Sequence, residues 1–143
     1  MANQNTLPVR ISVAADSTIP MLGVRLSSTS VLGKVQAQTT LYTVPTGKTA
    51  VVTHIVLRMT SASNVTGVAT ITAGVTAAWT SILASTALTG FDATGEYIVL
   101  HVANPSIVTA AAGVIKLDVA TGATTTDVGD TYTFNVSLFG YLY

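Results

Sequence analysis

Residues 131–143 read TYTFNVSLFGYLY, and this stretch decides the class of fold. Large apolar residues stand at every second position with small polar residues between them; the apolar set is Tyr132, Phe134, Val136 and Leu138. Successive side chains of a strand point to opposite faces, so this period predicts a β-strand with one dry face and one wet face. Residues 114–120 repeat the pattern, with Ile115, Leu117 and Val119 on one face and Lys116 and Asp118 on the other. We predict that these two segments form an antiparallel pair.

Further strand-like segments recur at short intervals and are rich in threonine and valine, which are branched at Cβ and pack well on a pleated surface. The predicted strands are residues 9–15, 22–30, 35–44, 48–60, 65–75, 96–103, 114–120 and 131–143. Residues 76–88 are the one helix candidate, because Trp79, Ile82, Leu83 and Ala87 follow helical spacing; an irregular crossing segment is the alternative. This pattern predicts an all-β fold, an antiparallel β-sandwich of jelly-roll-like type with at most one short helix, in a single domain over residues 1–143.

The composition excludes several classes of partner. Only 8% of the residues are charged, against about 25% in an average soluble domain, and six basic residues balance six acidic ones. Such a surface has no cation cluster for phosphate groups, so we predict neither nucleic acid nor a membrane as a partner. A free monomer usually stays soluble through its charges. We therefore expect a homo-oligomer, or other proteins, to cover part of the surface.

The chain is expected to be made in the cytoplasm. Its first residues are polar and lack the basic and apolar regions of a signal peptide. No apolar run approaches the roughly 20 residues that cross a bilayer. The absence of cysteine excludes disulfides and a cysteine nucleophile.

Two motifs that often carry function have simpler interpretations here. Gly47-Lys48-Thr49 resembles the end of a phosphate-binding loop, but Tyr42 stands where that motif requires its first glycine, and a strand follows instead of a helix. We interpret this segment as a hairpin turn. His54 and His101 each stand within a predicted strand, with no second ligand at short spacing. They can meet as metal ligands, but a half-buried histidine satisfied by a neighbour is the favoured interpretation.

No set of residues predicts catalysis. Asp92 and Glu96 are the nearest carboxylate pair for glycosidase chemistry, but they flank a Thr-Gly break and are interpreted as solvated loop residues. A Ser-His-Asp triad lacks the support of a Gly-x-Ser-x-Gly elbow. Asp127-Val128-Gly129-Asp130 is interpreted as a turn, since a calcium loop brings more oxygen ligands. We predict that the protein is not an enzyme and has no catalytic residue, cofactor or metal site.

The C-terminal stretch is the best candidate for a contact surface. The polar face of residues 131–138 continues as Phe139, Tyr141 and Tyr143, so aromatic side chains occur on both faces of this strand. Aromatic residues concentrate in subunit contacts, which makes these three the candidate interface. The alternative is that a loop of the same chain covers them. Trp79, the one tryptophan, offers the same choice, and a core position is favoured.

Several phrases of the sequence resemble small virion proteins of tailed bacteriophages. Residues 41–53, LYTVPTGKTAVVT, are similar to a strand–turn–strand phrase of that group, and residues 136–142, VSLFGYL, are similar to its terminal strand. Residues 97–104 and 112–121 resemble two further strands, so the likeness covers residues 40–143. The resemblance implies a jelly-roll-like protein that decorates or cements capsids, or serves as a tail or fibre module. It brings no catalytic residues.

Composition and resemblance together imply a non-enzymatic virion structural protein. The leading hypothesis is a capsid decoration (cement) protein, a homotrimer that bridges and stabilises major capsid subunits. The alternative is a tail-fibre module that binds a receptor or a carbohydrate, with Trp79 beside Asp92 or Tyr97 as the place to look. The N-terminal residues lie outside the resemblance, which leaves open an arm over residues 1–20 that contacts a neighbour.

Overall fold

The computed structural model describes residues 23–76, 78–109 and 113–143. These residues form strands and no helix: β1 (Val24–Leu32), β2 (Gln38–Thr43), β3 (Thr49–Ala62), β4 (Val65–Gly67), β5 (Thr70–Val75), β6 (Ala78–Ala87), β7 (Tyr97–Thr109), β8 (Val114–Thr121), β9 (Thr124–Thr125) and β10 (Tyr132–Leu142). The predicted strand over residues 9–15 and the arm over residues 1–20 lie outside the described residues. They stay predictions, as does the single domain over residues 1–143.

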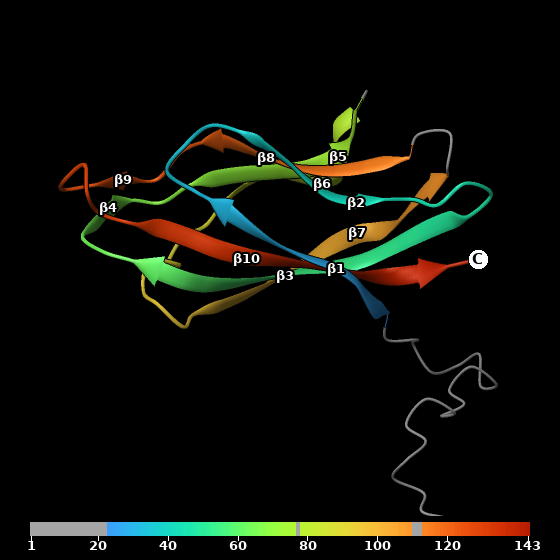
Figure 1. Cartoon of the computed structure of the whole chain (residues 1–143), viewed down its shortest axis with the longest axis horizontal. Helices are drawn as coiled ribbons and strands as arrows, with labels where there is room; N and C mark the ends of the chain where they lie inside the picture. The colour runs from blue at the N-terminus through green and yellow to red at the C-terminus, as the bar shows by residue number, and fades with distance from the viewer. Residues whose placement is uncertain (1–22, 77, 110–112) are drawn as a thin grey trace, which may run out of the picture.

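Two four-stranded sheets make up the body of the fold. One has the order β1-β10-β3-β7, the other has the order β2-β8-β5-β6, and β4 pairs with β9 in a small third sheet. Figure 1 shows the two large sheets as two layers, with β4 and β9 at one end and the C-terminus at the other. The antiparallel pairs β1·β10, β2·β8, β3·β7 and β5·β6 are those of one long hairpin wrapped into two sheets, which is a jelly-roll-like order. The predicted all-β sandwich is confirmed.

The predicted pairing of residues 114–120 with residues 131–143 is wrong. These segments are β8 and β10, and they belong to different sheets. Both have one dry face because both turn it toward the same core, from opposite sides. Alternation reports that a strand has a buried face, but it does not report which strand lies beside it.

The helix candidate over residues 76–88 is also wrong, since residues 78–87 form strand β6. The pairing of β6 with β5 is irregular: Ala73 lies opposite Leu83, whereas Val75 lies opposite Ala78. The extra residues on β6 form a bulge, so the neighbours Ile82 and Leu83 are both buried. Two adjacent buried residues break the period of two and imitate helical spacing.

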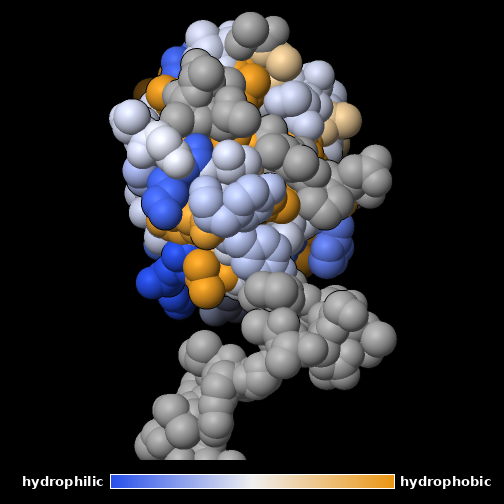
Figure 2. Space-filling view, turned by 90° about the vertical axis from the view of Figure 1, so that its right-hand side faces the viewer, coloured by the Kyte–Doolittle hydropathy of each residue, from blue (hydrophilic) through white to orange (hydrophobic). Residues whose placement is uncertain are grey.

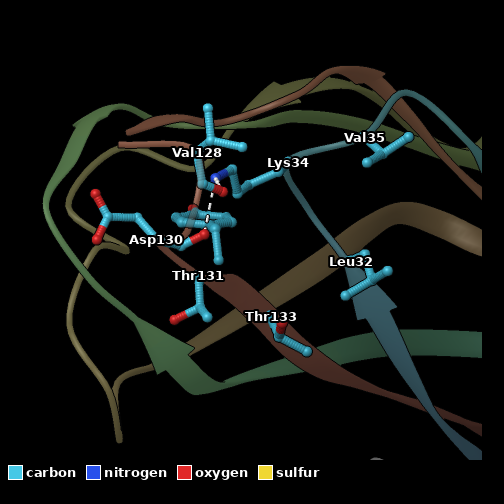
Figure 3. A pocket seen from close by; sticks show the side chains of 8 residues that line it. Leu32, Lys34, Val35, Val128, Asp130, Thr131 and Thr133 are labelled. Carbon is cyan, nitrogen blue, oxygen red and sulfur yellow. Dashed lines mark hydrogen bonds between the residues drawn. The ribbon is translucent and has the colours of Figure 1, made fainter. Parts of the chain in front are cut away.

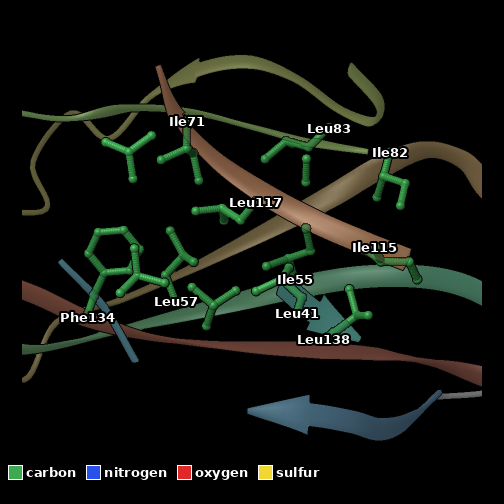
Figure 4. Packing of buried hydrophobic residues seen from close by; sticks show 14 of the residues in the cluster. Leu41, Ile55, Leu57, Ile71, Ile82, Leu83, Ile115, Leu117, Phe134 and Leu138 are labelled. Carbon is green, nitrogen blue, oxygen red and sulfur yellow. The ribbon is translucent and has the colours of Figure 1, made fainter. Parts of the chain in front are cut away.

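The core lies between the two sheets. Strands β3 and β10 contribute Ile55, Leu57, Phe134 and Leu138, and the opposite sheet contributes Ile71, Ile115 and Leu117, all fully buried. Figure 4 shows these side chains reaching toward one another from the two layers. Full burial of one such side chain contributes about 1.5 to 3 kcal/mol, and this apolar contact holds the layers together. The outer faces of both sheets are left for other contacts.

Backbones approach closely where β1 meets the end of β10. A Cβ atom on Gly140 would overlap the carbonyl oxygen of Val51 and would lie 3.2 Å from Cδ1 of Leu26. A Cβ atom on Gly23, just before β1, would lie 2.7 Å from the nitrogen of Gly140. The absence of side chains at both positions is therefore what allows β1, β10 and β3 to lie this close together.

Candidate interface on the outer face of one sheet

The C-terminal strand presents aromatic side chains away from the core. In β10, Phe134, Val136 and Leu138 point inward and are fully buried, while the residues between them are only partly buried. Phe139 and Tyr141 belong to this outward set. Tyr143 continues the alternation, because it exchanges backbone hydrogen bonds with Thr49 of 2.8 and 3.1 Å. The three predicted interface residues therefore lie on one face.

Strand register sets the neighbours of these residues, because directly opposed residues share a face. One row across the sheet is Arg25, Phe139, His54 and His101, from β1, β10, β3 and β7 in turn. The next row is Ser28, Ser137, Val56 and Val99, and a third is Ser30, Asn135, Arg58 and Tyr97. We call the surface formed by these three rows with Tyr141 and Tyr143 the outer face.

Aromatic contacts organise the outer face. The rings of Phe139 and His54 are stacked, with centroids 4.6 Å apart and an angle of 8° between their planes. The centroid of the His101 ring lies 6.3 Å from that of His54, at 37°. Farther along the sheet, the guanidinium carbon of Arg58 lies 5.8 Å from the centre of the Tyr97 ring, within cation–π range. These ring contacts lie within the chain itself and limit the orientations of the side chains on the outer face.

Much of this aromatic and apolar surface is accessible. Tyr97 is 64% exposed, Val99 is 50% exposed and Tyr143 is 66% exposed. The four strands contain two arginines, Arg25 and Arg58, and no lysine or acidic residue. Exposed aromatics with arginine and without acidic groups match the usual composition of the centre of a protein–protein contact.

Burial alters two titratable groups on the outer face. The pKa of His54 is lowered, first by burial and then by the nearby His101. The pKa of Tyr141 is raised by burial. Both shifts favour the neutral form, so the centre of the outer face carries little charge near neutral pH.

The sequence pattern identified only part of this surface. Phe139, Tyr141 and Tyr143 were found because they interrupt the polar side of one strand. His54 lies on β3, and Val99 and Tyr97 lie on β7; only the strand register places them on the same face as the outward residues of β10. The sequence predicted strands at these positions, but it did not predict that the strands share a sheet with β10.

The remaining candidates are structural. Gly47 has φ of 76°, and the nitrogen of Lys48 donates to the carbonyl of Pro45 at 3.0 Å. The turn predicted here is therefore present, but it joins β2 and β3 of different sheets, so it is a corner between sheets and the predicted hairpin is wrong. Glu96 Oε2 accepts hydrogen bonds from the nitrogens of Asp92 and Ala93 at 2.7 and 2.8 Å. It organises its own loop.

Asp130 closes the turn at residues 127–130. Its carboxylate accepts hydrogen bonds from the nitrogen of Asp127 at 2.9 Å, from Ser63 Oγ at 3.0 Å and from Asn64 Nδ2 at 2.9 Å. Lys34 Nζ donates to the carbonyls of Asp127, Val128 and Asp130 at 3.4, 3.2 and 2.7 Å. An ammonium group thus faces the oxygens that a cation would need, which agrees with the interpretation as a turn.

A shallow cavity of about 220 Å³ lies beside this turn. Its lining is Leu32, Lys34, Val35, Val128, Asp130, Thr131, Tyr132 and Thr133, and Figure 3 shows Leu32 and Val35 on one side with the Lys34 ammonium directed into the turn. The volume is below the roughly 300 to 1,000 Å³ of typical small-molecule sites. The side chains of Lys34, Asp130 and Thr131 already make hydrogen bonds within the chain, so the cavity offers a ligand few partners.

Trp79 does not join the residues considered with it as a carbohydrate platform. Its ring faces Lys116 of β8, a strand of the same sheet, with the ammonium 5.3 Å from the ring centre. Trp79 is near the start of β6, and the loop that holds Asp92 follows the end of this strand, so most of the length of β6 separates the two residues. Tyr97 lies on the outer face beside Arg58. Trp79 is only partly buried, so it is not a core anchor either.

The described residues contain neither a metal-ligand cluster nor a membrane-spanning helix. No group of three or more histidine, cysteine, aspartate or glutamate side chains is placed to hold a metal ion there. Nor does that part of the chain contain a helix long and apolar enough to span a membrane. Figure 2 views the C-terminal end of the sandwich, where orange and pale residues interleave and deep blue ones are few.

Comparisons with known proteins show a likeness of fold. No family model matches the chain, and no curated protein matches its sequence. Among solved structures, it is similar to a chain of the cyanophage Pam1 capsid asymmetric unit, with a TM-score of 0.55 and 20% sequence identity. The match covers 83% of this chain and 84% of that chain. The two chains share a fold.

Proposed function

We propose that this chain is a non-enzymatic structural protein of a bacteriophage virion. More specifically, we propose a capsid decoration (cement) protein that bridges and stabilises major capsid subunits. The fold shared with a chain of a phage capsid asymmetric unit supports the virion setting. The observation that carries the proposal is the outer face, with exposed Tyr97, Val99 and Tyr143 around the stacked Phe139 and His54 and with no acidic residue in its four strands.

The outer face suits attachment by apolar contact. Its side chains stand on a hydrogen-bonded sheet, so few of them lose freedom when a partner docks, and a rigid surface binds more tightly than a mobile one of equal area. Its charges are two arginines, one of which already faces Tyr97. Attachment therefore depends mainly on burial of aromatic and aliphatic groups and little on ion pairs.

The first test is the salt dependence of attachment to purified particles. Raising salt from about 0.1 M to about 1 M shortens the Debye length from roughly 10 Å to roughly 3 Å. Apolar attachment survives this change, and particles keep their full complement of the protein in a sedimentation assay. Release of the protein over this range would contradict the proposal, because it would show that ion pairs hold it.

The second test removes the candidate interface. The variant Phe139→Ser/Tyr141→Ser/Tyr143→Ser is added back to particles that lack the protein, and bound protein is measured against wild type. We expect at least a tenfold loss of affinity, because buried aromatic anchors dominate interface energies. The control is Val128→Ser, which changes a fully exposed apolar residue at the opposite end of the sandwich. Equal binding by the triple variant and the control would refute the outer face as the attachment surface.

We also propose a homotrimer, whose three modest contacts act together at high effective concentration. Native mass spectrometry of the purified protein tests this, and a monomer at the concentrations that saturate particles excludes it. Immunogold labelling tests the location. Label over the whole capsid supports decoration, whereas label confined to tail tips would favour the alternative, a tail-fibre module that binds a receptor or carbohydrate.

A further inference from the structure

The two histidines of the chain lie opposite each other on neighbouring strands. His54 of β3 and His101 of β7 are register partners, and their ring centroids are 6.3 Å apart. Both side chains are on the outer face, where His101 is exposed and His54 is partly buried. The full sequence contains only these two histidines and no cysteine. Every imidazole that the protein possesses is therefore gathered at one point.

Hydrogen bonds favour one tautomer of His54. The Thr53 hydroxyl can donate its single proton to the carbonyl of Phe139, with Oγ1 and the carbonyl oxygen 3.3 Å apart. The same Oγ1 lies 3.0 Å from Nδ1 of His54, and both contacts are hydrogen bonds at once when Nδ1 carries the hydrogen and Oγ1 accepts it. In a neutral imidazole the lone pair is then on Nε2. A metal-ligating histidine is commonly oriented in this way, by donation from its other ring nitrogen to an oxygen.

Although the sequence alone predicts no metal site, we propose that His54 and His101 form a binding site for a divalent transition-metal ion such as Cu²⁺, Ni²⁺ or Zn²⁺. A bond of about 2.0 to 2.1 Å from each ring nitrogen lets two rings share an ion only when their centroids are within about 6.5 Å of each other. The observed 6.3 Å is at this upper limit, and rotation of the exposed His101 ring shortens it toward the roughly 5 Å that a tetrahedral ion requires. Neutral imidazole is the form that ligates metals. Water completes the coordination.

The site joins β3 to β7, which is an edge strand of its sheet. Between the register pair His54–His101 and the next pair, Val52–Ser106, the two strands are out of step. An ion held by one residue from each strand would bridge them directly beside this irregularity. Phe139 stacks on one face of the His54 ring, whereas an ion binds a ring nitrogen in the plane of the ring, so the stacked contact does not occupy the ligand position.

Calorimetric titration of the isolated full-length protein with NiCl₂ and with CuCl₂ tests the site, and it does not depend on the proposed virion role. We expect one ion per chain, with Cu²⁺ bound more tightly than Ni²⁺ as the ordinary order of stability requires. His54→Gln and His101→Gln each lower the affinity at least tenfold, and the double variant shows no saturable binding. Wild-type affinity in either single variant overturns the proposal, because one histidine alone would then account for binding.

A second measurement needs no histidine variant. Cu²⁺ is paramagnetic and broadens the NMR signals of nearby protons. If the two histidines share the ion, substoichiometric Cu²⁺ should broaden the imidazole proton resonances of both His54 and His101 in the wild-type spectrum. Broadening of only one of them overturns the proposal. Val99→Ala is the matched control, since it changes the neighbouring row of the outer face but keeps both ligands, and it should retain saturable binding of one ion per chain.

Discussion

The hydroxyl of Tyr132 donates a hydrogen bond of 2.6 Å to the backbone carbonyl of Phe91. The bond ties the first residue of β10, in one sheet, to the loop that follows β6 of the other sheet. Both side chains are fully buried, and their rings meet edge to face with centroids 6.4 Å apart. Burial raises the pKa of Tyr132 to about 12, so the hydroxyl remains a neutral donor near physiological pH.

Removing this hydroxyl should destabilise the fold. In Tyr132→Phe the ring contacts remain, but the Phe91 carbonyl loses its partner in a dry environment, and we expect the free energy of unfolding to fall by about 1 to 2 kcal/mol. Urea denaturation measures the change. The control is Tyr97→Phe, which removes a hydroxyl from a ring that is 64% exposed and should change stability by less than about 0.5 kcal/mol. Equal effects of the two variants would mean that the bond contributes nothing.

Adding a methyl group at Gly140 should be costly. Its Cβ atom would overlap the carbonyl oxygen of Val51, and backbone atoms of paired strands cannot move aside independently. We expect Gly140→Ala to lose at least about 2 kcal/mol of stability, as overpacked sites do. Gly129→Ala is the matched control, because nothing lies within 4 Å of the added atom there. Thermal unfolding of the two variants compares them, and a Gly140→Ala protein as stable as the control would show that β3 and β10 can separate without cost.

The turn closed by Asp130 should make stability depend on acid pH. The hydrogen bond from the Asp127 nitrogen is the largest cause that lowers the pKa of Asp130, and Ser63, Asn64 and Lys34 add to it. A lowered pKa means that the contribution is complete above the unfolded value of about 3.9 and is lost as pH falls through the folded value. The stability difference between wild type and Asp130→Asn should therefore shrink below about pH 4. Asp118→Asn, which removes a carboxylate without a hydrogen bond in the described part of the chain, should show no such convergence.

The histidine pair should act at higher pH than Asp130. Because burial and His101 lower the pKa of His54, the unfolded chain binds more protons than the folded chain just below the ordinary value of about 6.5. Stability should therefore decrease as pH falls through this range. His54→Gln should flatten the curve between about pH 7 and pH 5 in chemical denaturation. An unchanged slope in the variant would assign the pH dependence to another group.

The sequence predicted the fold class because alternation is a local property. The pattern of Tyr132, Phe134, Val136 and Leu138 places β10 and its buried face correctly. Pairing is not local, and so the strand beside β10 was predicted wrongly. The helix prediction for residues 76–88 failed for a related reason. Ile82 and Leu83 both point inward because of the bulge where β6 pairs with β5, and that pairing is not local.

The candidate site shows the same limit. Phe139, Tyr141 and Tyr143 were predicted as an interface from one strand alone, and that interface stays a prediction. The contact between His54 and His101 could not be predicted, because the two residues are far apart in the sequence and no short-range spacing marks them. Their meeting depends on the register of β3 with β7, which long-range packing sets.

The strand order has a consequence for how the protein is made. Among the described strands, only β5 and β6 are neighbours both along the chain and within a sheet. Strand β1 pairs with β10, and β2 pairs with β8, which are both synthesised much later. A chain emerging from the ribosome can therefore form one local hairpin early and can complete neither large sheet until the distant partners have been synthesised. Folding dominated by such remote pairings takes milliseconds to seconds, and during that interval the unpaired strand edges are open to aggregation and to capture by chaperones.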